Sequence, residues 1–283
     1  MLTITALGGA LGGEATGIDL AKPLDDGDFA EVERAFATHL VLVIRDQKLA
    51  PADQVAFTRR FGAVEPHPLR SRRGADGFPE VLVIENRPGM PGARNDEWHS
   101  DITCSERPPA LSVLQALVVP QALGATMYCN MYRAYETLSA GMRRMLEDMN
   151  ALHSAESLVR RNNEPGTDAL PIAETPPPVS HPVVRTHSVT GRPALFVNPS
   201  FTIGFDGMTR EESAPLLAFL YDHATRPENV YRHAWRPGDV VMWDNRCTMH
   251  YAVHDYDETT PRLMHRTTAA GERPYFKRTQ AAA

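Results

Sequence analysis

Short apolar runs bounded by proline and glycine dominate the chain after residue 63. Runs of this kind, separated by turn residues, are typical of strands in a β-sandwich or jelly roll. The predicted strands are 81–84, 110–119, 181–186, 194–197, 230–235, 240–243 and 262–269. The pattern therefore predicts a mainly β protein with flanking helices and a double-stranded β-helix, or jelly-roll, core.

Helices are expected around this β core. Val32 and Phe36 recur at helical spacing with their neighbours, Pro51 suits the first position of a helix, and Thr209-x-x-Glu212 is a capping box. The expected helices are 28–39, 51–61, 132–149 and one that begins at Thr209, with a strand over 40–44.

Residues 154–180 interrupt the strand pattern with Asn-Asn, Pro-Gly and Pro-Pro-Pro sequences and show little periodicity. Structureless segments of this length are uncommon in compact domains unless they are lids or disordered. We therefore expect 154–180 to be a lid loop within one domain that spans residues 1–283.

Composition excludes several classes of protein. The 42% hydrophobic and 23% charged residues are ordinary for a soluble globule, and a net charge of −6 with scattered arginines gives little support for nucleic-acid binding. No stretch has about 18 uninterrupted apolar residues, so we expect no membrane span. Cys104, Cys129 and Cys247 match neither a disulfide framework nor a zinc knuckle, which favours a reducing cytoplasm. We expect a homo-oligomer with a small-molecule partner.

Trp98-His99-Ser100-Asp101 places an imidazole and a carboxylate two residues apart. In a strand such residues share one face, about 7 Å apart along the backbone, so both could reach one metal ion. Alone the pair is a weak signal, because the chain has 11 histidines and a surface salt bridge would explain it.

A third candidate ligand, His250, follows far along the chain, and Arg262 comes 12 positions later. His-x-Asp, then a distant His, then an Arg is the order in which a facial triad for non-haem iron is assembled on a jelly roll. Such a triad leaves open positions for a chelating co-substrate and dioxygen, whereas a structural zinc site is closed by four ligands. The order predicts metal ligation by His99, Asp101 and His250.

Arg262 and Arg266 are four residues apart in a predicted strand. They should therefore point to one face, about 13 Å from each other, and offer two separate guanidinium forks for anions. A solvated arginine at a strand end is the simpler explanation for either one alone.

The chain resembles the taurine dioxygenase family over nearly all of its length. The matching segments, in order, are 13–20, 43–47, 60–62, 98–101, 181–187, 195–198, 243–246 and 264–266. The resemblance implies that His99, Asp101 and His250 bind Fe(II), and that Thr126 and Arg262 bind the distal carboxylate of 2-oxoglutarate.

The resemblance also implies the reaction. 2-Oxoglutarate chelates the iron, substrate binding frees a site for O2, and oxidative decarboxylation yields succinate and carbon dioxide while a substrate carbon is hydroxylated. If that carbon bears a sulfonate or ether oxygen, C–S or C–O cleavage follows. Sulfonate recognition in the family uses groups that appear here as His67, Asn95, Phe201 and Arg266, which suit a small organic anion.

Three positions depart from the taurine enzymes. Residues 123–126 read Leu-Gly-Ala-Thr in place of Gly-Gly-Asp-Thr, Arg70 stands where a tyrosine is expected, and Arg94 replaces an acidic residue that would contact the substrate's amine. Arg70 and Arg94 add positive charge and so disfavour a small zwitterion. We expect an organic anion that is larger or less amine-dependent than taurine.

Alternatives to this assignment stay open. The same chemistry could act on an aryloxyalkanoate, an alkyl sulfate or an amino-acid derivative. A non-catalytic jelly-roll binding protein would keep the ligands as relics, and a zinc hydrolase is disfavoured because no general base is positioned near the triad. His67 could be an exposed loop residue and Phe201 a core residue, whereas Trp98, Trp243 and the remaining histidines are interpreted as structural.

Overall fold

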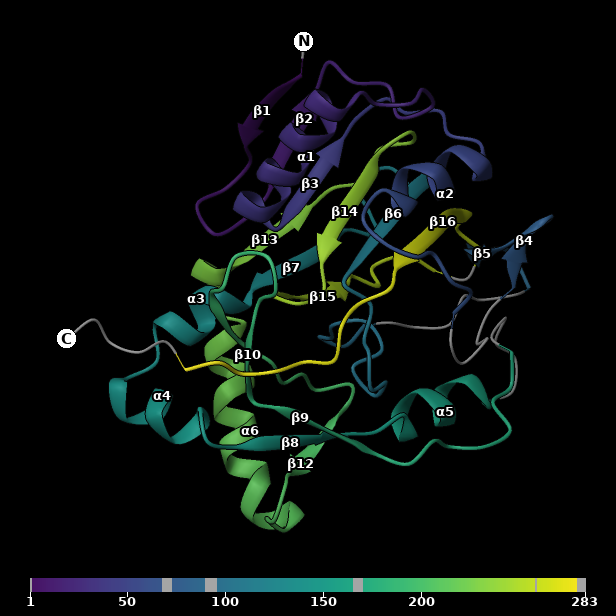
Figure 1. Cartoon of the computed structure of the whole chain (residues 1–283). Helices are drawn as coiled ribbons and strands as arrows, with labels where there is room; N and C mark the ends of the chain where they lie inside the picture. The colour runs from purple at the N-terminus through teal and green to yellow at the C-terminus, as the bar shows by residue number, and fades with distance from the viewer. Residues whose placement is uncertain (1, 68–72, 90–95, 165–169, 258, 279–283) are drawn as a thin grey trace.

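The computed structural model describes residues 2–67, 73–89, 96–164, 170–257 and 259–278. The chain forms a strand-rich α/β structure around an eight-stranded sheet (Figure 1). The strands follow one another across this sheet as β1 (Thr3–Ala6), β2 (Gly13–Thr16), β3 (Val41–Ile44), β14 (Val240–Asp244), β6 (Leu111–Val118), β16 (Arg262–Ala269), β5 (Phe78–Asn86) and β4 (Gly74–Ala75). Its central strands come from distant parts of the sequence, so the sheet joins the two halves of the chain.

A second, three-stranded sheet packs against the large one. Its order is β13 (Val230–His233), β7 (Thr126–Asn130) and β15 (Thr248–Ala252). The main apolar core lies between the two sheets and combines Tyr128 and Met249 of the small sheet with Leu114, Trp243 and Met264 of the large one. The space between the sheets therefore holds side chains from both.

Two N-terminal helices cover the outer face of the large sheet. These are α1 (Asp26–His39) and α2 (Pro51–Arg59). The side chain of Asp25 caps α1 by accepting from the backbone of Asp28 at 2.8 Å, and Phe36 packs against Leu42 and Val113 beneath it. The large sheet is thus buried on both faces at its centre.

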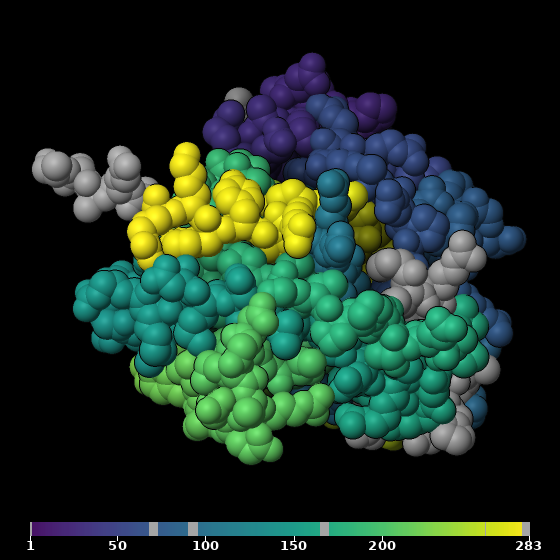
Figure 2. All heavy atoms as spheres, turned by 60° about the horizontal axis from the view of Figure 1, so that its bottom comes forward, coloured from purple at the N-terminus to yellow at the C-terminus, as the bar shows by residue number. Residues whose placement is uncertain are grey.

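The other elements surround the small sheet. They are α3 (Met131–Glu136), α4 (Ala140–Leu146), β8 (Asn150–His153), α5 (Glu156–Asn162), β9 (Val179–Pro182), β10 (Val184–Thr186), β11 (Pro193–Leu195), β12 (Thr202–Phe205), α6 (Arg210–Ala224) and the 3-10 helix η1 (Pro227–Asn229). Figure 2 shows the yellow C-terminal segment between the purple and blue N-terminal part of the chain and these teal and green elements. The carbonyl of Tyr275 accepts from the backbone of Thr186 at 2.7 Å, which ties this segment to β10.

Most predicted elements are confirmed within a few residues. The capping box at Thr209 begins α6, with hydrogen bonds between Thr209 and Glu212 in both directions. The strand predicted over 262–269 is β16.

Among the described residues, no helix has the length and apolar character of a membrane span.

Two predicted segments are wrong in detail. The helix expected over 132–149 is broken in two, because Thr137 ends α3 and Ser139 caps the start of α4 by accepting from Met142. Residues 154–180 are not all loop, since helix α5 occupies Glu156–Asn162; residues 165–169 lie outside the described part of the chain. Strands β7 and β15, which carry Thr126 and His250, were not predicted.

Candidate functional site

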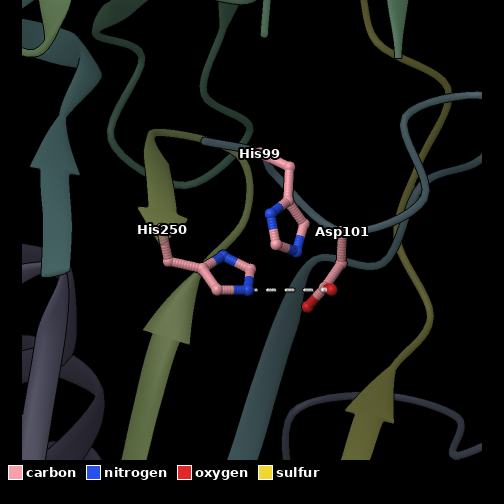
Figure 3. A group of neighbouring side chains, drawn as sticks. All are labelled: His99, Asp101 and His250. Carbon is pink, nitrogen blue, oxygen red and sulfur yellow. Dashed lines mark ion pairs between the residues drawn. The ribbon is translucent and has the colours of Figure 1, made fainter. Parts of the chain in front are cut away.

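His99, Asp101 and His250 lie together between the two sheets, and their side chains point toward one another (Figure 3). One ligand atom from each lies within 4.8 Å of the other two, and all three residues are buried. His250 is the central residue of β15. His99 joins it as an isolated bridge, with backbone hydrogen bonds of 2.9 Å and 2.7 Å exchanged between the two histidines. The predicted triad is therefore assembled as a candidate metal site.

Asp101 does not continue a strand from His99, contrary to the expected strand geometry. It begins a turn over residues 101–104, and side chains hold its carboxylate. Ser112 of β6 donates to Oδ2 at 2.6 Å, and Asn245 accepts from the Asp101 backbone at 3.2 Å while donating to Ser112 at 3.1 Å. Neither Ser112 nor Asn245 was predicted as a site residue, because nothing in local spacing links them to Asp101.

The triad is in the protonation state that a cation requires. A carbonyl only accepts hydrogen bonds, so the 2.7 Å contact with the Glu97 oxygen makes Nδ1 of His99 the donor and leaves Nε2 free. Burial lowers the pKa of both His99 and His250, which keeps the imidazoles neutral. Burial opposes ionisation of Asp101, but Arg266 and the two histidines hold its pKa below the ordinary range. Two neutral imidazoles and one carboxylate fit a divalent transition metal.

Arg266 is buried, so the alternative of a solvated arginine is wrong. Its Nη1 donates to Oδ1 of Asp101 at 2.9 Å. Its Nε is buried without a partner among the described residues. Arg266, predicted from the sequence only as a substrate-binding residue, thus also contacts a candidate metal ligand directly.

Arg262 is also buried, 8% exposed, and lies on the same face of β16 as Arg266. Within the described chain no carboxylate pairs with it, and its Nε lacks a partner. Burial lowers the pKa of its guanidinium. Gly124 lies against it, since a Cβ there would stand 3.4 Å from Nε. A buried arginine in this condition fits an incoming carboxylate.

Thr126 lies two residues after Gly124, at the start of β7. Its Oγ1 accepts from Nε1 of Trp235 at 2.9 Å. A hydroxyl that accepts one hydrogen bond still has its own hydrogen to donate. Thr126 and Arg262, which lie on different sheets, are thus brought together through Gly124, and each has a donor to offer a carboxylate.

An apolar cluster borders the triad on another side. Phe201 is 3% exposed, and its ring meets that of His99 edge-on at 6.4 Å. It packs with Ile102 and with Leu158 and Val159 of α5. Ile102, directly after Asp101, has φ 47°, an uncommon conformation for a β-branched residue that indicates local strain. Phe201 is therefore both buried in a cluster and adjacent to a candidate ligand.

The remaining residues predicted to lie near the substrate are His67, Asn95, Arg70 and Arg94. His67 is half-buried and its role stays a prediction. Asn95, Arg70 and Arg94 lie outside the described residues.

A second group of candidate ligand atoms, in His187, Asp244 and Cys247, is a structural network. Nδ1 of His187 accepts from the backbones of Val189 and Thr190 at 3.2 Å and 3.1 Å, so Nε2 carries the hydrogen donated to Asp244. Arg246 makes two further bonds to the same carboxylate, at 2.9 Å and 2.6 Å. No lone pair of His187 is free for a metal.

Comparisons with known proteins agree with this geometry. Residues 3–268 match the family model described as Taurine catabolism dioxygenase TauD, TfdA family. The chain is 34% identical to an alkylsulfatase of Acinetobacter baylyi over 96% of this chain and 86% of that protein. It is 33% identical to an alpha-ketoglutarate-dependent 2,4-dichlorophenoxyacetate dioxygenase of a Burkholderia species, over 92% of each.

A solved structure is similar to the same family. A taurine dioxygenase from Burkholderia xenovorans superposes with a TM-score of 0.81 at 33% sequence identity, covering 96% of this chain and 92% of that one. The family match spans both sheets and all three residues of the triad. The chain belongs to the TauD/TfdA family of Fe(II)- and 2-oxoglutarate-dependent dioxygenases.

Proposed function

We propose that this dioxygenase hydroxylates a small organic anion and releases succinate and carbon dioxide, with C–S or C–O cleavage where the hydroxylated carbon bears the heteroatom. The observation that carries the proposal is Arg262, a buried cation without a counter-ion among the described residues, on the same strand face as Arg266, which contacts the candidate metal ligand Asp101. A carboxylate bound between Arg262 and Thr126 would supply the missing charge. The neighbouring triad would hold the metal to which the other end of 2-oxoglutarate binds.

In this proposal His99, Asp101 and His250 hold the iron, and the iron with 2-oxoglutarate and O2 supplies the oxidising chemistry. Ser112 and Asn245 orient the carboxylate of Asp101, as residues around a metal ligand commonly do. Trp243 and Tyr128 pack on the imidazole of His250, with ring centroids at 4.8 Å and 6.2 Å, and keep it facing the metal. The apolar core around the triad excludes water.

Arg266 is the proposed anion fork for the substrate. With Nη1 bonded to Asp101, the Nε edge of the guanidinium stays available to an oxyanion. His67, Asn95 and Phe201 are proposed to complete the site. Ile102 and Phe201, with Leu158 and Val159 of α5, offer an apolar wall, which suits an alkyl or aryl chain better than the two-carbon chain of a taurine-type zwitterion.

The substrate class we favour is a sulfonate-type anion. An aryloxyalkanoate, an alkyl sulfate or an amino-acid derivative is the alternative within the same chemistry, and the relatives named for alkyl sulfates and for 2,4-dichlorophenoxyacetate support the first two. The remaining proposals are a single domain with a jelly-roll core, a homo-oligomer and a cytoplasmic location. Residues 154–180 are proposed to order over the substrate, which hydrogen exchange with and without ligands would test.

The test is a substrate screen that follows succinate formation by protein reconstituted anaerobically with Fe(II) and then exposed to oxygen. Sulfonates, alkyl sulfates, aryloxy acids and N-substituted amino acids form the panel. Succinate coupled to one of them would support the proposal. Binding of Fe(II) and 2-oxoglutarate without turnover of any panel member would favour the non-catalytic binding protein instead.

A further inference from the structure

Tyr128 carries a buried hydroxyl that the fold itself does not use. The residue is 0% exposed, and its phenolic oxygen has no hydrogen-bond partner in the described part of the chain. Buried polar groups without partners are rare in native proteins, because each loses its hydration without compensation. An orphaned phenol inside a candidate active site therefore indicates a partner that arrives from outside the chain.

The position of Tyr128 shows where that partner would lie. On β7 it points to the same side as Thr126, two residues before it. Across the strand pair it is directly opposite His250 of β15, and the two rings stack with 27° between their planes. Tyr128 thus lies between the candidate metal ligand His250 and Thr126 on one face of the small sheet.

Arg262 lies on the facing sheet against Gly124, which precedes Thr126 by two residues. Burial raises the pKa of Tyr128 well above its ordinary value, and the charge of the Arg262 guanidinium opposes that shift. In the described part of the chain the hydroxyl of Tyr128 and Nε of Arg262 both lack an acceptor, so each has a hydrogen to donate to an incoming carboxylate.

We propose that Tyr128 is a third donor to 2-oxoglutarate, and that its phenolic hydrogen bonds to the carboxylate held by Arg262 and Thr126. This inference rests on the proposed function, since it assumes that 2-oxoglutarate occupies the site. A phenylalanine at 128 would keep the ring on His250 and remove only the donor. Tyr128 is in this sense a binding residue for the co-substrate, added to the pair that the family resemblance implies.

Tyr128→Phe separates this role from a structural one. In calorimetric titrations of Mn(II)-loaded protein with 2-oxoglutarate, we expect Kd to rise about tenfold or more, because a hydrogen bond to a charged group is lost. Without ligand the variant should melt at the same temperature as the wild type or higher, since an unsatisfied buried hydroxyl is gone. Mn(II) affinity should not change.

Tyr132→Phe is the matched control. Its phenol is also fully buried but is satisfied by Thr190 at 2.9 Å. Its loss should lower the melting temperature and leave the 2-oxoglutarate Kd unchanged. If wild type binds 2-oxoglutarate and Tyr128→Phe binds it equally well, the role of Tyr128 is refuted and the proposed function stands. If Mn(II)-loaded wild type does not bind 2-oxoglutarate, both fail.

Discussion

Arg266 and Asp101 form a buried ion pair in which Nη1 of the guanidinium donates to Oδ1 of the carboxylate at 2.9 Å. The same Oδ1 lies 4.0 Å from Nε2 of His250. One oxygen of Asp101 therefore faces both the metal position and the arginine that we assign to the substrate. The substrate anion would therefore bind Arg266 and the metal would bind Asp101, the two partners of one salt bridge.

The first prediction concerns this ion pair. Arg266→Ala leaves the Asp101 charge buried and unpaired, which should destabilise the metal-free protein by roughly 3 kcal/mol. A bound divalent cation would restore the missing positive charge, so the loss should shrink clearly in Mn(II)-loaded protein. Urea unfolding with and without Mn(II) measures both values. Arg278→Ala, which breaks an exposed pair with Asp148, is the control and should cost less than about 1 kcal/mol in either state.

A second prediction concerns the triad. His99→Ala, Asp101→Ala and His250→Ala each remove one of three metal bonds and should abolish both tight Mn(II) binding and succinate formation. Ser112→Ala removes only a hydrogen bond to Asp101, so its metal affinity should fall by about 10- to 100-fold. Calorimetry ranks the variants. A triad variant that binds metal more tightly than Ser112→Ala would contradict the ligand assignment.

The third prediction concerns Arg262. Arg262→Ala should weaken 2-oxoglutarate binding by roughly 2–5 kcal/mol, because the carboxylate loses its buried charged partner. In the metal-free protein the same change removes an unpaired cation and should cost little stability. The apparent KM for 2-oxoglutarate, with the Kd in Mn(II)-loaded protein, checks this. An unchanged KM would transfer the carboxylate to Arg266.

A fourth prediction follows from His153, which is 0% exposed. Burial, and then the neighbouring His181, lower its pKa from 6.5 to about 3. Between pH 6.5 and pH 3 the unfolded chain therefore binds a proton at His153 that the folded chain does not bind. The stability contributed by neutral His153 is complete above pH 6.5 and is lost as the pH falls toward 3. The slope amounts to about 1.4 kcal/mol per pH unit.

His153→Gln cannot take up that proton. The free energy of unfolding, measured in urea between pH 7 and pH 5, should therefore fall less steeply for the variant than for the wild type. The other buried histidines contribute equally to both proteins and cancel in the comparison. Equal slopes would mean that folding does not lower the pKa of His153.

Order and spacing were enough to predict the triad, because His99, Asp101, His250 and Arg262 form a sequence pattern that one kind of metal site requires. The strands that position them were harder. Thr126–Asn130 and Thr248–Ala252 are short and mostly buried, so they show no alternation of apolar and polar residues. These segments form strands because they pair with each other, and pairing between segments far apart in the sequence leaves no local pattern.

Contacts between distant residues explain the other omissions. Arg266 and Asp101 are 165 positions apart, and Ser112 reaches Asp101 from another sheet strand. No spacing rule connects such residues. Likewise the break near Ser139 was hidden because apolar residues on either side keep helical spacing, while the cap is a single hydrogen bond to Met142. Tyr128 carried no pattern, and only its missing partner in the folded chain reveals it.

The last prediction concerns the substrate, which we expect to be an anion without a nearby amine. Arg266 offers its free Nε edge to one oxyanion, and carboxylates, sulfonates and sulfates all suit that fork. Beside the triad, Ile102, Phe201, Leu158 and Val159 form an apolar wall. A cationic amine placed against it would lose hydration without gaining a partner.

The sequence strengthens this expectation, since Arg70 and Arg94 stand where taurine enzymes carry neutral or acidic groups. Like charges brought together cost free energy, so kcat/KM for taurine should be at least about tenfold lower than for an amine-free alkyl sulfonate of matched length, a difference of ~1.4 kcal/mol. Lengthening the alkyl chain should raise kcat/KM as more apolar surface meets the wall. Steady-state succinate assays with taurine, the matched sulfonate, an alkyl sulfate and an aryloxy acid measure these ratios. A clear preference for taurine would refute the expectation, because neither the apolar wall nor the added arginines could then be facing the substrate's second end.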